Sequence, residues 1–250
     1  MFIKLCMLML SDWLQKTMHQ HVGCYCDLCR LPIEPRHRAL AHLPSSIWCY
    51  SCLALFAPTP RCLRCGLTTI TTTPQCGQCL SNPPLWSSLY CVGDYTAPLS
   101  GYIHRFKYQQ QFWHAKPLSA LLSLHIDSKP ELITCVPLHW QRYLLRGFNQ
   151  SELLAKQLAK IMSIPTSTDL FSRIKHTPQQ KGLNKRQRQK NLQQAFRLNF
   201  NPKQKHIAIF DDVVTTGSTT HHLCKLLLDA GVETIDIYCI CRTPELDNSI

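Results

Sequence analysis

Hydrophobic positions in the second part of the chain follow two alternating periods, one typical of buried strands and one typical of amphipathic helices. Short, nearly continuous apolar runs predict strands at 89–95, 132–136, 206–210 and 234–241. Apolar positions at helical spacing predict helices at 102–108, 115–125, 151–162 and 219–230. This alternation is typical of an α/β fold, a parallel sheet with helices on both faces. We therefore expect a ligand of the domain at 85–250 to bind beyond the carboxyl ends of the strands.

The part of the chain before residue 85 lacks these periods. Residues 23–84 are rich in cysteine, proline and short loops, and this segment cannot bury enough apolar surface to fold without cross-links. The preceding segment, 1–22, begins with an apolar stretch that Lys4 interrupts. We expect a short helix there that packs on the body of the protein, with a membrane-associating segment as the alternative. No apolar run approaches the roughly 20 residues that span a bilayer, so we expect no transmembrane segment.

Eight of the 15 cysteines form four Cys-x-x-Cys pairs. Two such pairs can complete a tetrahedral zinc site, and four sulfur ligands make it structural because no position stays open. The clustering and the odd total favour metal sites in a reducing compartment over a disulfide scaffold. Interleaved pairing uses the same spacings, and Cys24 or His42 could replace a ligand. Paired in sequence order, the expected zinc ligands are Cys26, Cys29, Cys49 and Cys52 for one site, and Cys62, Cys65, Cys76 and Cys79 for the other.

The chain is strongly basic, with 27 Lys and Arg against 15 Asp and Glu, a formal net charge of +12. This balance favours polyanionic partners such as nucleic acid or phosphorylated ligands. Residues 173–205 contain ten Lys and Arg and no acidic residue, which predicts a solvated flexible loop or a groove that tracks phosphates. Phe171, Phe196 and Phe200 could offer stacking faces there, or belong to the core. The candidate DNA contacts in this segment are Arg173, Lys185, Arg186, Arg188 and Lys190.

The most informative stretch, 207–220, reads IAIFDDVVTTGSTT. An apolar strand delivers two carboxylates, and a turn rich in Thr, Gly and Ser then opens a helix. Gly217 permits inward-facing N–H groups, and the helix N-terminus adds partial positive charge, so the turn predicts a phosphate-binding loop. The carboxylates can accept hydrogen bonds from sugar hydroxyls or hold a divalent cation. The alternative is a plain turn with Ser218 or Thr219 as a helix cap. The candidate site residues are Asp211, Asp212, Val213, Thr215, Thr216, Gly217, Ser218 and Thr219.

Two arginines follow the strand predicted at 132–136, at the same edge of the sheet. Arg142 and Arg146 can bind oxyanions through their planar, forked donors, so we expect them to contact pyrophosphate or DNA phosphate. The alternative is that both are solvated residues before a helix.

The stretch at 207–220 resembles the phosphoribosyl pyrophosphate (PRPP) signature of type I phosphoribosyltransferases. With the four cysteine pairs and further motifs in the same order, it resembles the ComF family, including its GntX-type members, over essentially the whole chain after residue 23. Those motifs are Arg142, Arg146-Gly147-Phe148-Asn149-Gln150-Ser151, Arg173, Thr177, Gln180, Leu183, Arg186, Arg188, Asn191 and Ala195-Phe196. The resemblance implies a double zinc ribbon followed by a type I phosphoribosyltransferase-like domain. It also implies that Asp211 and Asp212 contact the ribose hydroxyls, that 215–219 wrap the 5-phosphate, and that Mg²⁺ accompanies the pyrophosphate.

The same resemblance implies a competence protein that binds and handles incoming single-stranded DNA during natural transformation. Its expected location is the cytoplasm, with the inner face of the membrane as an alternative, and its expected partners are a competence helicase and a recombination mediator. The alternative function is an active phosphoribosyltransferase that uses PRPP and Mg²⁺ on an unidentified acceptor. A third interpretation makes PRPP or a nucleotide a regulatory ligand of a DNA-handling scaffold. No nucleobase-recognition hood can be identified in the sequence, which leaves turnover and the acceptor open.

Overall fold

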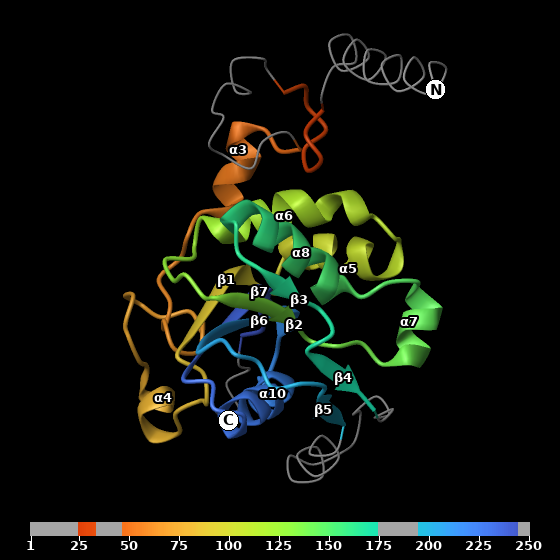
Figure 1. Ribbon diagram of the computed structural model, residues 1–250. Coiled ribbons are helices and arrows are strands. Elements are labelled where there is room, and N and C mark those ends of the chain that lie inside the picture. Colours follow the sequence, from red (N-terminus) through yellow and green to blue (C-terminus); the bar gives the residue numbers. More distant parts are fainter. Residues whose placement is uncertain (1–24, 34–46, 175–194, 245–250) are drawn as a thin grey trace, which may run out of the picture. The chain divides into compact units, whose positions relative to one another are not determined.

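The computed structural model of the chain describes residues 25–33, 47–174 and 195–244 (Figure 1). The chain divides into two units, Met1–Ala57 and Pro58–Ile250. The first unit contains helix α3 (Tyr50–Leu53) and the 3-10 helix η1 (Ala54–Phe56). The second contains the sheet together with the second group of cysteines, whose last member, Cys79, lies on helix α4 (Gly77–Ser81). The module boundary expected near residue 85 stays a prediction, and the helix expected within 1–22 lies outside the described residues.

Five parallel strands form the sheet of the second unit, in the order β1-β7-β6-β2-β3. They are β1 (Ser88–Asp94), β2 (Leu132–Cys135), β3 (Thr166–Ser167), β6 (His206–Val214) and β7 (Thr234–Arg242). The chain winds outward from β2 to β3, returns to β6 beside β2, and then winds the other way to β7. In sheets of this kind ligands bind outside the carboxyl ends of the strands at the point of reversal. A ligand site is therefore expected at the carboxyl ends of β2 and β6.

Helices cover both faces of this sheet, as the alternating periods predict (Figure 1). One face carries α5 (Leu99–Tyr108), α6 (Ala115–Ser123) and α8 (Gln150–Met162), and the other carries α10 (Ser218–Asp229). Ile207 and Ile209 of β6 belong to the same buried cluster as Leu223 and Leu227 of α10. Every residue of β7 after the first is buried, because strands covered on both faces have no solvent side. The predicted α/β fold is confirmed.

The structure differs from the predicted elements in several places. Strand β6 runs to Val214 instead of ending at Phe210, so both aspartates lie on the strand itself. The edge strand β3, helix α7 (Trp140–Arg146) and the antiparallel pair β4 (Phe171–Arg173) and β5 (Phe196–Leu198) were not predicted. Elements of two to seven residues are too short to show a clear hydrophobic period. Phe171 and Phe196 are buried in the core, whereas Phe200 is exposed.

The second cysteine group packs along the edge strand β1. The backbone N–H of Leu89 donates to the carbonyl of Leu63 at 2.9 Å, and Arg61 forms an ion pair with Asp94 at 2.8 Å. Gly66 has a φ of +73°, and a Cβ at this position would collide with the Leu89 side chain. The cysteine loop therefore lies against the sheet over the length of β1. No helix in the described residues has the length and apolar character needed to cross a membrane.

Candidate functional site

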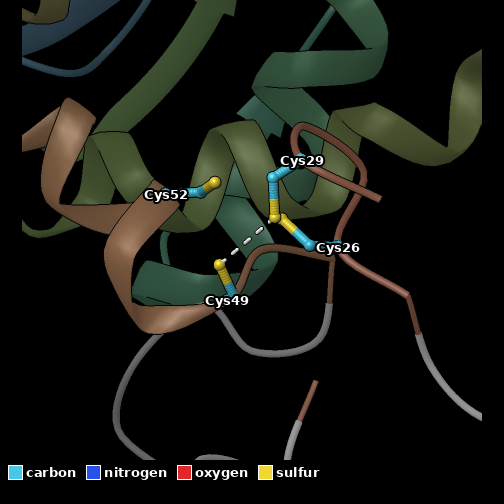
Figure 2. Close-up of side chains that lie close together, drawn as sticks. All are labelled: Cys26, Cys29, Cys49 and Cys52. Atoms are coloured by element: carbon cyan, nitrogen blue, oxygen red, sulfur yellow. Dashed lines mark hydrogen bonds between the residues drawn. The ribbon is translucent and has the colours of Figure 1, made fainter. Parts of the chain in front are cut away.

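Eight cysteines form two tetrads, and in each the four sulfur atoms lie within 4.8 Å of one another. The tetrads follow sequence order, as expected. The first, shown in Figure 2, has its Cys29 and Cys49 sulfurs 3.7 Å apart, and in the second the Cys65 and Cys76 sulfurs are also 3.7 Å apart. Zinc–sulfur bonds of about 2.3 Å in a tetrahedron place sulfur atoms about 3.8 Å apart, so both tetrads have the dimensions of structural zinc sites.

Backbone amides prepare the second tetrad for a cation. The Cys62 sulfur accepts a hydrogen bond from the N–H of Cys76 at 3.2 Å. Burial acts to raise the pKa of Cys62, but N–H groups of Cys65, Cys76 and Arg64 outweigh it and lower the pKa to about 7. Because the thiolate is the form that binds zinc, these amides favour the ligand state of Cys62, whereas burial raises the pKa of Cys65 and Cys79. The alternative ligands Cys24 and His42 lie outside the described residues.

The predicted phosphate loop curves around a cavity of about 90 Å³ at the end of β6. Its lining residues are Asp211, Val213, Val214, Thr215, Thr216, Gly217, Ser218, Thr219 and Thr220. Gly217 has a φ of +71° and lies directly before α10, and a Cβ there would come within 2.7 Å of the Trp86 ring. Glycine is therefore required at this position for both its backbone conformation and its size. All the predicted loop residues except Asp212 meet at this cavity.

The two aspartates lie in different environments. Asp211 accepts hydrogen bonds from the hydroxyl of Ser151 at 3.2 Å and from the N–H of Asp212 at 2.9 Å. Asp212 forms an ion pair with Lys107, at the end of α5, with 2.9 Å between Nζ and Oδ2. Burial and the neighbouring charge of Asp212 raise the pKa of Asp211 to about 7. A cation or a set of hydroxyl donors placed beside Asp211 would favour its ionised form.

Lys107 is a site residue that the sequence analysis missed. Its side chain is partly buried, which acts to lower its pKa, but the charges of Asp212 and Asp211 outweigh burial and raise the pKa. Asp212 thus has a fixed cation as partner, whereas Asp211 lies at the cavity. A single lysine on a helix carries no motif, and only the packing of α5 against the sheet brings it to β6.

Arg146 and the residues after it connect α7 to α8 at the end of β2. Asn149 caps α8 by accepting from the Ser151 N–H at 3.1 Å, and it donates its amide to the Val136 carbonyl at 3.0 Å. Arg146 donates to Gln150 at 3.2 Å, and its guanidinium lies 5.4 Å from the centre of the Tyr108 ring. This motif therefore positions the start of α8, and with it Ser151, against Asp211. Arg142 lies on α7.

The basic segment is only partly described. Arg173 lies on β4, with its guanidinium 5.3 Å from the centre of the Phe196 ring. The other candidate contacts, Lys185, Arg186, Arg188 and Lys190, lie outside the described residues.

Arg242, the last residue of β7, joins the phosphate loop to the second cysteine tetrad. Its Nε donates to the Cys65 carbonyl at 2.9 Å, and its Nη1 donates to the carbonyls of Val214 at 3.2 Å and of Thr215. Trp86, which lies against Gly217, donates to the Arg64 carbonyl at 2.7 Å. The sequence analysis missed Arg242, and the available signal was a charged residue at the end of a mostly apolar strand.

A second, larger cavity of about 480 Å³ adjoins the phosphate loop. It shares Thr216, Gly217 and Ser218 with the small cavity. Its remaining lining residues are Cys65, Gln78, Cys79, Asn82, Pro83, Pro84, Trp86, His221, His222 and Arg242. Residues of the second tetrad and of the phosphate loop thus line the same cavity.

The chain is similar in sequence to known proteins over most of its length. Residues 149–248 match the phosphoribosyl transferase domain family. Competence protein F of Haemophilus influenzae is 37% identical over 82% of this chain and 94% of its own length. DNA utilization protein YhgH of Escherichia coli is 36% identical over 87% of this chain and 96% of its own length. These matches extend beyond the α/β domain into the cysteine-rich part. A solved purine phosphoribosyltransferase from Pyrococcus horikoshii is 14% identical, with a TM-score of 0.30, over 55% of this chain and 84% of its own.

Proposed function

The chain belongs to the ComF family, and we propose that it binds and handles incoming single-stranded DNA in the cytoplasm during natural transformation. The observation that carries the proposal is the small cavity formed by Asp211 and the turn at 213–220, located where the sheet reverses its winding. It occurs in a chain whose relatives are named as competence and DNA utilization proteins. The family also makes a competence helicase and a recombination mediator the expected partners.

The cavity suits a ribose 5-phosphate such as that of PRPP. The first N–H groups of α10 have no intrahelical acceptors and point toward the turn, and the helix adds partial positive charge. Hydroxyls of Thr215, Thr216, Ser218 and Thr219 supply further donors at the lining. Asp211 can accept hydrogen bonds from ribose hydroxyls once it is ionised. Its carboxylate also suits Mg²⁺, which prefers oxygen ligands and, when bound, would offset the charge of the pyrophosphate.

The electrostatics of the chain favour a nucleic acid as the larger ligand. The net charge of +12 attracts phosphates, and the basic run between 173 and 205 contains no acidic residue. Each phosphate that a protein neutralises releases counterions, so binding should weaken as salt increases. Lys107 adds a fixed cation beside Asp212, and Arg146 adds one beside Gln150.

The test is fluorescence anisotropy of a labelled single-stranded oligonucleotide, titrated at several salt concentrations with and without Mg²⁺–PRPP. We expect binding at low salt with an affinity that falls steeply as salt rises. Competition by PRPP would place DNA and sugar phosphate on one surface. Absence of binding at low salt would overturn the DNA-handling proposal. Calorimetry with Mg²⁺–PRPP tests the pocket separately, and the sharpest variant is Asp211→Asn because this side chain lines the cavity.

A second candidate function is phosphoribosyl transfer from PRPP to an acceptor. The observation that favours it is the position of Arg146 near the end of β2, across from the aspartates of β6. A transferase of this kind works by positioning: the loop holds the 5-phosphate, and cations take the charge of the leaving pyrophosphate. Release of pyrophosphate from PRPP in the presence of candidate nitrogen acceptors would reveal it, and Arg146→Met should then lower the rate.

A further inference from the structure

Five aromatic side chains near the end of α5 and on α7 are left exposed to solvent. They are Tyr108, Phe112, Trp113, Trp140 and Tyr143, and between 42% and 63% of each is exposed. Phe112 and Trp113 belong to the 3-10 helix η2 (Phe112–His114). We call these five residues the aromatic surface. By contrast, Trp48 and Trp86 are buried. Five exposed aromatic side chains in these segments indicate a surface that binds a ligand or a partner molecule.

Two segments distant in sequence meet in this surface. The Phe112 ring lies 4.5 Å from the ring of Phe148, the residue that follows α7 and its terminal glycine. The Arg146 guanidinium lies 5.4 Å from the Tyr108 ring. Trp140 and Tyr143 are three positions apart on α7 and so lie on the same side of the helix. Helix α7 has seven residues and is about 10 Å long, so the backbone positions of Trp140 and Tyr143 both lie within about 10 Å of that of Arg146.

The charge around the aromatic surface favours a polyanion. Residues 95–126 and 132–151 supply all five aromatic side chains, and neither segment contains an aspartate or a glutamate. The same segments contain the cations Arg105, Lys107, Lys116, Arg142 and Arg146, of which Lys107 is already paired with Asp212 of β6. A phosphate chain would therefore meet attraction and no opposing carboxylate from these segments. Aromatic faces combined with cations are what proteins use to bind single strands without sequence preference.

We propose that the aromatic surface is the platform on which bases of single-stranded DNA stack, with the strand passing Arg146 toward the carboxyl end of β6. The inference rests on the proposed function and adds a location to it. Tyr108 directly follows Lys107, the partner of Asp212, and Arg146 bonds to Gln150 beside Ser151. A strand on this platform thus reaches the sugar-phosphate pocket. The phenylalanines of β4 and β5, expected as stacking faces, are buried and cannot serve.

The experiment compares variants of the full chain in the anisotropy titration, with an oligo-dT and an abasic oligonucleotide of equal length. We expect Trp140→Ala and Tyr143→Ala each to weaken oligo-dT binding by about 5- to 150-fold, the range of one stacked base. The abasic strand should bind equally to wild type and variants, and the slope of affinity against salt should not change because no charge is removed. Trp140→Phe, which keeps an aromatic face, should restore most of the affinity.

Tyr25→Ala is the matched control, since Tyr25 is 60% exposed and belongs neither to the aromatic surface nor to the basic segment 173–205. It should bind both strands like wild type, and circular dichroism should find all variants folded because the replaced side chains are on the surface. If the wild type binds oligo-dT and both Trp140→Ala and Tyr143→Ala bind it equally well, the location of the platform is overturned but the proposed function is not. Equal weakening for oligo-dT and abasic strands would also overturn stacking. No binding by the wild type would overturn both.

Discussion

Replacing Arg242 with methionine should destabilise the second unit and weaken sugar-phosphate binding together. The guanidinium of Arg242 bonds to the Cys65 carbonyl in the second tetrad and to the Val214 and Thr215 carbonyls at the base of the phosphate loop. Methionine is of similar length and fills the space, but it has no hydrogen-bond donor. The loop would therefore lose the group that holds its first residues in place.

The magnitude follows from which carbonyls are buried. The bonds to Cys65 and Val214 are buried, and a buried carbonyl that loses its donor costs about 1–3 kcal/mol. The bonds to Thr215 and Thr243 are only partly buried, so water can replace the lost donor there. Part of the cost is offset because a buried charge no longer has to be desolvated. We expect the free energy of unfolding to fall by about 2–4 kcal/mol.

Urea denaturation of the zinc-loaded protein measures this loss, and calorimetry with Mg²⁺–PRPP measures the effect on the loop. Arg61→Met is the matched control: Arg61 also bonds to the second tetrad, through the Gly66 carbonyl at 3.0 Å, and pairs with Asp94 at 2.8 Å. Gly66 and Asp94 lie outside the phosphate loop, so the Arg61 variant should lose stability but keep its PRPP affinity. Wild-type stability in Arg242→Met, or an equal loss of affinity in both variants, would refute the reasoning.

Three further predictions concern the same unit and its neighbour. The pKa of Asp211 is raised from 3.8 to about 7 in the folded chain, so its contribution to the free energy of unfolding should decrease as pH rises between these values. Over the same range, ionisation of Asp211 should increase the affinity for Mg²⁺–PRPP, up to about pH 7. Asp211→Asn should remove both trends in pH titrations, and their persistence would contradict the assignment. Gly217→Ala should cost about 1–3 kcal/mol in thermal unfolding, since it strains a φ of +71° and crowds Trp86, and an unchanged Tm would argue against the loop geometry. Cys62→Ser and Cys26→Ser should each remove one of two zinc ions by elemental mass spectrometry, but only Cys62→Ser should weaken PRPP binding; full zinc content in either would disprove the ligand assignment.

Local patterns in the sequence were sufficient for the fold class and the tetrads. The apolar runs of β6 and β7 are nearly continuous because helices cover both faces of the sheet, and this leaves a direct trace in the sequence. Cys-x-x-Cys spacing reflects the tight turn that two ligands of one metal require. Gly217 and its hydroxyl neighbours mark the phosphate loop because the whole feature lies within ten consecutive residues.

Residues whose role depends on distant partners were not predicted. Lys107 pairs with Asp212 only because α5 packs beside β6, and no motif in the sequence around Lys107 predicts this ion pair. The aromatic surface was missed for a related reason, since Trp140 and Tyr143 could equally have been core residues. Conversely, Phe171 and Phe196 lie beside the basic segment in sequence, yet short strands turn them into the core.

The sequence by itself determined which segments are strands and helices, which cysteines can share a metal, and which turn we propose to bind phosphate, because each depends on residues close together in the chain. Only the tertiary structure decided which groups support that phosphate loop. The bond from Arg242 to Cys65 spans 177 positions and exists because β7 lies beside both β1 and β6. Periodicity records whether a side chain is buried, but the order of strands in the sheet decides which other side chains it meets.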